Sequence, residues 1–96
     1  MAKWLVRRRL SATASRLKSL RADLAVADEQ IMYLRGDADD AATRAIVSEN
    51  SAARMDARQA REQVEALRAH RDRMVREIAD LERRQDTLLD ELTATD

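Results

Sequence analysis

Two stretches of sequence decide the fold: residues 6–34, VRRRLSATASRLKSLRADLAVADEQIMYL, and residues 64–92, VEALRAHRDRMVREIADLERRQDTLLDEL. In both, apolar residues recur at alternating steps of three and four, the roughly 3.5-residue period of a coiled-coil seam. With Leu10 assigned to position a of a heptad abcdefg, the a and d positions of the first stretch are Val6, Leu10, Thr13, Leu17, Leu20, Leu24, Ala27, Ile31 and Leu34. Those of the second stretch are Val64, Leu67, Arg71, Met74, Ile78, Leu81, Gln85, Leu88 and Leu92. The pattern predicts two long helices, each of which buries one narrow stripe.

Both series continue toward the middle of the chain on small residues, namely Ala38, Ala41 and Ala45 from one side and Ala60, Ala57 and Ala53 from the other. Gly36 falls at position f, which faces solvent, and does not interrupt the period. The series break only at residues 48–51, Ser-Glu-Asn-Ser, which are mostly poor helix formers and include good helix N-caps. We therefore expect the chain to turn there. A turn centred on Gly36 is the alternative that the sequence leaves open.

The predicted fold is all-α, a two-helix antiparallel coiled-coil hairpin with helices at about 3–47 and 51–93 and a turn at 48–50. The whole chain, 1–96, forms one helical-hairpin domain. A turn at this point sets Leu10 opposite Leu88 and the polar Thr13 opposite the polar Gln85. Arg71 falls opposite Ala27, whose small side chain leaves it room. Because a polar residue in a coiled-coil seam penalises slipped alignments, we expect Arg71 to fix the register.

Charged residues beside the seam do not select the register by themselves. In the predicted alignment Asp28 faces Arg68, which is attractive, whereas Arg16 faces Arg84, which is repulsive. Each exposed pair contributes only about 0–1 kcal/mol, so the balance is close to even. The two ends of the chain differ more clearly, because residues 1–22 carry only basic charges and residues 75–96 a net negative charge. The hairpin places these opposite charges side by side, which a parallel dimer would not do.

Composition supports the helical prediction and limits the classes of function. Charged residues make up 38% of the chain and aromatic residues 2%, with no Pro, no Cys and one Gly, which is typical of a coiled coil rather than a globular core. The formal net charge is zero, so no overall field attracts nucleic acid or anionic lipid. No apolar run approaches the roughly 20 residues of a membrane-spanning helix. The lack of cysteine fits a reducing compartment, and we expect a cytoplasmic protein.

We expect no catalytic, cofactor-binding or metal-binding residues. His70 is the only histidine and no cysteine accompanies it, so neither a nucleophile–base pair nor a zinc site can be assembled. Asp37, Asp39 and Asp40 resemble a calcium loop in composition only, because Ser48 stands where the loop needs a glutamate. A pair of helices also lacks the concave pocket that catalysis requires. The sequence therefore predicts a protein that is not an enzyme.

Several apolar residues lie outside the predicted seam, and these mark a candidate partner interface. They occupy positions b and c of the first helix: Val26, Met32, Tyr33, Ile46 and Val47. Self-association into a homodimer with four helices explains them best, and a different protein partner or tolerated exposure are the alternatives. We expect a non-enzymatic interaction module, an adaptor or regulator that presents coiled-coil surface.

The N-terminal end offers a second candidate site. Trp4, Arg7, Arg8 and Arg9, with Leu5 beside them, could contact phosphates or a membrane surface. Pairing of these arginines with Asp90 and Glu91 across the hairpin is the competing explanation. The alternative function is therefore a nucleic-acid-associated or membrane-peripheral factor.

The residue usage also carries a resemblance. The chain is rich in Ala and Arg and has only two lysines, Lys3 and Lys18. Along its whole length it resembles small uncharacterised coiled-coil proteins of high-GC actinobacteria. The resemblance rests on composition and on the hairpin pattern, and it implies a bacterial coiled-coil protein.

Overall fold

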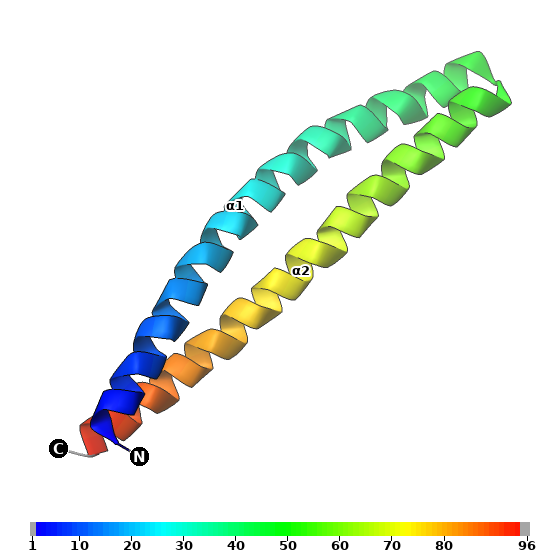
Figure 1. Cartoon of the computed structure of the whole chain (residues 1–96). Helices are drawn as coiled ribbons and strands as arrows, with labels where there is room; N and C mark the ends of the chain where they lie inside the picture. Colours follow the sequence, from blue (N-terminus) through cyan, green and yellow to red (C-terminus); the bar gives the residue numbers. More distant parts are fainter. Residues whose placement is uncertain (1, 95–96) are drawn as a thin grey trace. The chain divides into compact units, whose positions relative to one another are not determined.

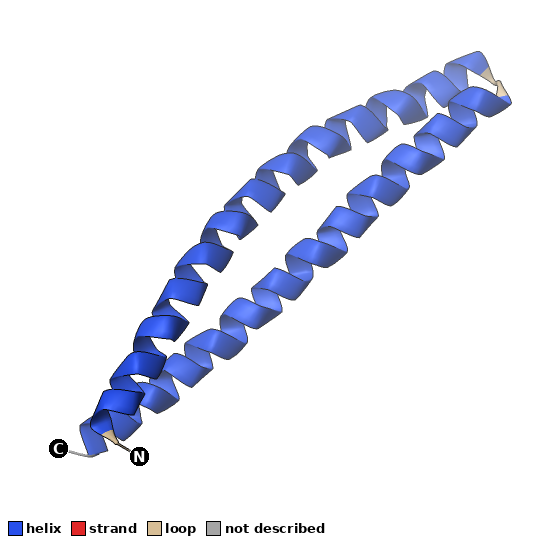
Figure 2. Ribbon diagram, viewed as in Figure 1, coloured by secondary structure: helices blue, strands red, loops and turns tan. Residues whose placement is uncertain are grey.

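The computed structural model describes residues 2–94, which form two α-helices and no strand. Helix α1 spans Lys3–Ser48 and helix α2 spans Ser51–Ala94. Figure 1 follows α1 from blue to green and α2 from green to red. Figure 2 shows that nearly all of the described chain is helical, apart from a short loop between the helices. The predicted two-helix antiparallel hairpin is confirmed, and the predicted helix ends agree with the observed ones to within one residue.

The chain divides into two compact units, each made of one segment from each helix. The terminal unit contains the described residues up to Leu24 and from Arg73 onward, and the turn unit is Ala25–Asp72. In each unit a segment of α1 runs antiparallel to a segment of α2.

The buried residues lie where the heptad pattern places them. Every predicted a and d position, including the alanines near the turn, is buried or half-buried. Val6 and Leu17 are the largest side chains that lose nearly all of their accessible surface. Each helix therefore contributes one stripe to the core, and the rest of its surface remains exposed because two helices can cover no more.

The polar residue Thr13 shows how a buried hydroxyl is satisfied in this seam. Thr13 is buried, and its Oγ1 donates a hydrogen bond of 2.8 Å to the carbonyl oxygen of Arg9 in the same helix. This bond avoids the cost of an unpaired buried polar group without help from α2. The expected match between Thr13 and Gln85 is therefore not needed to satisfy Thr13.

The turn forms at Glu49 and Asn50, as the break in the heptad pattern predicts. Glu49 adopts a left-handed backbone conformation with φ of 53°, the usual way for a helix to end. Asn50 then caps α2, because its Oδ1 accepts a hydrogen bond of 2.7 Å from the amide of Ala53. Gly36 lies inside α1 instead, and nothing approaches within 4 Å of the point where a Cβ would stand. The alternative turn at Gly36 is thus excluded.

Ion pairs between the helices differ from the expected ones. Asp28 pairs with Arg71 at 2.7 Å rather than with Arg68. Arg16, expected to oppose Arg84, pairs with Glu77 at 3.1 Å. A flexible arginine side chain can reach along the helix by about one turn, roughly 5.4 Å, so it selects an acidic partner above or below its own level. Arg16 therefore forms an attractive pair, although an idealised heptad diagram places it opposite another arginine.

No helix within residues 2–94 is long and apolar enough to cross a membrane.

Candidate functional site

The five apolar residues predicted to form a partner interface all lie on the surface of the turn unit. Tyr33 is 74% exposed and Val26 is 53% exposed, and Met32, Ile46 and Val47 are exposed to a similar or greater degree. None of them contributes to the seam between α1 and α2. The structure therefore leaves these side chains available for contact with another molecule.

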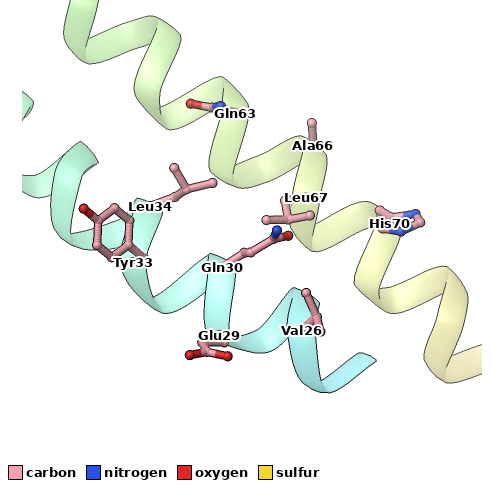
Figure 3. Close-up of a pocket in the computed structure, with 9 residues that line it drawn as sticks. All are labelled: Val26, Glu29, Gln30, Tyr33, Leu34, Gln63, Ala66, Leu67 and His70. Atoms are coloured by element: carbon pink, nitrogen blue, oxygen red, sulfur yellow. The ribbon is translucent and has the colours of Figure 1, made fainter. Parts of the chain in front are cut away.

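Two of the five residues, Val26 and Tyr33, line a groove of the turn unit. We call it the Tyr33 groove, an open depression of about 860 Å³ lined by Val26, Glu29, Gln30, Tyr33, Leu34, Gln63, Ala66, Leu67 and His70. Figure 3 shows that its walls come from both helices, with Gln30 extending from α1 toward Leu67 on α2. The exposed part is mostly apolar, with amide and imidazole groups at its margin. Such a lining suits a partner side chain or helix rather than a reacting small molecule.

Val47 lies in a second groove, beside the turn. This turn groove has a volume of about 490 Å³ and contains Arg44 and Asp56 as its charged groups. Like the Tyr33 groove, it is built mainly from c, d and g positions of both helices. The two grooves therefore belong to the same edge of the helix pair.

Met32 lies in a third groove, on the opposite edge. This Arg71 groove, of about 360 Å³, is lined by Asp28, Ile31, Met32, Arg35, Arg68, Arg71 and Asp72. Consecutive residues of a helix point about 100° apart, so Met32 and Tyr33 lie on different edges although they are neighbours in sequence. Ile46 and Val47 are separated in the same way, and Ile46 lines none of the three grooves. The predicted interface residues thus divide between two edges.

Arg71 organises the charges of its groove. Its Nε donates to Oδ1 of Asp28 at 2.7 Å, and its Nη1 donates to Oδ1 of Asp72 at 3.3 Å. The hydrogen bond to Asp28 raises the pKa of the Arg71 guanidinium, and the negative charge of Asp28 and the bond to Asp72 add to this effect. Arg71 therefore remains a cation that holds two carboxylates in place, and its side chain is 40% exposed rather than enclosed in the seam.

The basic end of the chain is also exposed. Trp4 is 65% exposed, and Arg7, Arg8 and Arg9 are exposed, whereas Leu5 is half-buried. Arg7 and Arg8 form no ion pair with any residue between 2 and 94. The expected pairing with the acidic end therefore does not extend to these two arginines.

The described part of the chain contains no group of three His, Asp or Glu side chains that could hold a metal ion. His70 lies at the rim of the Tyr33 groove as a surface residue.

Two features of the surface were not anticipated from the sequence. Met55, at position f of α2, is 54% exposed and lines none of the three grooves. The second is the position of His70, Gln63 and Ala66 in the lining of the Tyr33 groove. A helical-wheel projection of α2 would have identified Met55. The groove depends on how closely the two helices approach, and the sequence does not give that distance.

No family model matches this sequence, and neither a curated protein nor a solved structure is significantly similar to it.

Proposed function

We propose that this protein is a non-enzymatic interaction module that associates with further copies of itself through the exposed edges of the turn unit. One observation supports this proposal above all. The only tyrosine of the chain, Tyr33, is 74% exposed and stands with Val26 beside a largely apolar groove. Tyrosine is enriched at the energetic centres of interfaces because it combines a large apolar ring with a polar tip.

The physical reason for association lies in the shape of the buried stripe. Two helices bury only one face each, so apolar residues at b and c positions stay in water in a single hairpin. A second hairpin removes them from water and gives at least a four-helix assembly. Burial of apolar surface contributes about 25 cal/mol per Å², so a few such side chains can drive association.

The substitution Tyr33→Glu tests the proposal. Because Tyr33 lies outside the seam, the helix content measured by circular dichroism should remain nearly unchanged. Sedimentation velocity should show the association weakened at least about tenfold, since a charge replaces an anchoring aromatic side chain.

Met55→Glu is a matched control, because Met55 is exposed in the same unit but lines none of the grooves. This variant should associate like the unmodified protein. Equal association of both variants and the unmodified protein would exclude the Tyr33 groove as the interface. A wild-type protein that stays monomeric at all concentrations would overturn self-association itself.

A second candidate function uses the basic end of the chain. Its supporting observation is that Trp4 is 65% exposed while Arg7 and Arg8, one helical turn further on, have no ion pair with a described residue. An exposed indole beside free arginines suits an anionic lipid surface or a nucleic-acid backbone.

Trp4 is the only tryptophan, so its fluorescence reports this contact directly. Insertion into vesicles rich in phosphatidylserine should shift its emission to shorter wavelength, and added salt should reverse the shift. Binding to duplex DNA should likewise weaken steeply with salt. The variant Arg7→Gln/Arg8→Gln should lose either effect. If neither vesicles nor DNA change the emission of the wild-type protein, this function is excluded.

A further inference from the structure

The two edges of the turn unit carry opposite charges. One edge, which holds the Tyr33 groove and the turn groove, has Asp37 and Asp40 at its g and c positions; we call it the acidic edge. The other edge, which holds the Arg71 groove, carries five exposed arginines at its b and e positions, Arg35, Arg54, Arg58, Arg61 and Arg68; we call it the arginine edge. The charges of opposite sign on each edge are fewer, Arg44 on the first and Asp39 and Glu65 on the second outside the Arg71 cluster.

Apart from the Arg71 cluster, the charges on these edges have no ion-pair partner within residues 2–94. In the terminal unit, ion pairs cross between the helices on both edges, from Arg16 to Glu77 and from Arg21 to Glu82. In the turn unit, Arg71 alone forms such a pair among the described residues. The side chains of Asp37, Asp40 and the five exposed arginines of the arginine edge have no ion pair with any described residue. The turn unit thus exposes unpaired negative charges on one edge and unpaired positive charges on the other.

The unpaired charges of the two edges also lie at similar distances from the turn. Because α1 and α2 are joined at Glu49 and Asn50, Asp37 lies about as far from the turn as Arg61, and Asp40 about as far as Arg58. A second hairpin placed sideways against the first, pointing the same way, would bring each aspartate to the level of an arginine.

The exposed apolar residues of the two edges also lie at similar distances from the turn. Tyr33 on the acidic edge is one residue away from Met32 on the arginine edge, and Val47 is one residue away from Ile46. A sideways contact therefore meets apolar side chains at the levels of Tyr33 and Val47, and opposite charges between them.

From this arrangement we propose that the occupant of the acidic edge is the arginine edge of a second copy of this chain. The contact is heterologous, because each copy uses a different surface. A symmetric contact of one edge with itself would set arginines against arginines or aspartates against aspartates, which electrostatic complementarity disfavours. A heterologous contact leaves one edge open at each end of a pair, so the assembly extends or closes into a ring rather than stopping at a two-fold dimer.

This inference rests on the proposed self-association and specifies its geometry. Complementary charge reversals test it on the full-length chain. Variant one, Asp37→Arg/Asp40→Arg, has two basic edges, and variant two, Arg58→Glu/Arg61→Glu, has two acidic edges. All four positions are exposed, so circular dichroism should show unchanged helix content. Each variant alone should associate at least about tenfold more weakly than the wild-type protein in sedimentation velocity at low salt.

An equimolar mixture of the two variants should recover assemblies, because a basic edge of one then meets an acidic edge of the other. A single chain that carries all four substitutions should recover them too. Glu62→Arg, an exposed change of charge at position f, serves as the control and should associate normally.

Other results would overturn the inference in distinguishable ways. If the wild-type protein assembles and the two variants assemble equally well, or if mixing restores nothing, the edges do not pair although self-association stands. If the wild-type protein is monomeric, the proposed function fails as well. If variant two loses affinity for duplex DNA but still self-associates, the arginine edge is a phosphate-binding surface instead.

Discussion

At the scale of single residues, Arg71 shows how a polar side chain is accommodated in a coiled-coil seam. Its backbone occupies an a position, yet its guanidinium leaves the seam and binds Asp28 and Asp72 at the surface. The aliphatic part of the side chain can cover apolar surface while the charged end stays in water. Arg71 therefore acts through an exposed pair with Asp28 and not, as its position suggested, as a residue enclosed opposite Ala27.

The substitution Arg71→Leu should raise the midpoint of thermal unfolding by a few degrees. Leucine fills an a position well, and the loss is only an exposed ion pair, whose contribution is small. Asp28→Asn, which removes the same pair without adding apolar surface, should have little effect. A clear fall in the midpoint for Arg71→Leu would mean that the pair contributes more than exposed pairs generally do.

The raised pKa of Arg71 also determines how the contribution of this residue to stability depends on pH. A basic group whose pKa is higher in the folded state stabilises the fold at every pH below its unfolded value, and loses this effect only as pH rises through the folded value. For an arginine both values lie in strong alkali. The contribution of Arg71 itself is thus constant between neutral and mildly alkaline pH.

Gly36→Ala should stabilise the protein by about 1 kcal/mol, because alanine is the best helix former and glycine among the poorest. The site has room for the added methyl group, since nothing lies within 4 Å of it. Chemical denaturation monitored by circular dichroism measures the change. A destabilised variant would show that glycine is needed in α1, for example for close approach of another copy.

At the scale of elements, the break between α1 and α2 depends on two adjacent residues with different roles. Glu49 ends α1 in a left-handed conformation, and Asn50 begins α2 as its cap. The carbonyl oxygen of Glu49 also accepts a hydrogen bond from Arg54 of α2 at 3.1 Å. Hydrogen bonds at and next to the turn thus stabilise the end of α1 and the start of α2.

Replacement of Asn50 by alanine should lower stability by about 1 kcal/mol, the usual cost of losing an N-cap. Asn50→Asp keeps an acceptor oxygen at the same place and should be nearly neutral. Denaturation midpoints of the two variants make the comparison. If both variants lose stability equally, the side chain of Asn50 acts in some way other than capping.

At the scale of the whole molecule, α1 and α2 pack against each other in both units, so the stability of the fold and its association should be linked. If copies associate through the edges of the turn unit, dilution should lower the midpoint of thermal unfolding, because binding to the folded state stabilises it by mass action. Tyr33→Glu should make the midpoint lower and nearly independent of concentration. A range of about a hundredfold in protein concentration is enough to shift a binding equilibrium. If the midpoint of the wild-type protein stays the same over that range, stability and association are not linked.

The sequence alone determined the two helical periods and their antiparallel arrangement, and it favoured a turn at residues 48–50, while the structure excluded the alternative turn at Gly36. These follow from a period that is local to each helix and from one short break in it, and every predicted a and d residue is buried or half-buried in the structure. The exposure of Val26, Met32, Tyr33, Ile46 and Val47 follows from the same period.

Only the tertiary structure decided which charges pair and how the exposed apolar residues are distributed. The bond from Arg71 to Asp28 depends on how far a flexible side chain reaches between helices, which a heptad diagram does not contain. Tyr33 and Met32 are neighbours on α1 but line grooves on opposite edges of the helix pair. This separation depends on the position of α2, which packs against α1 between the two edges.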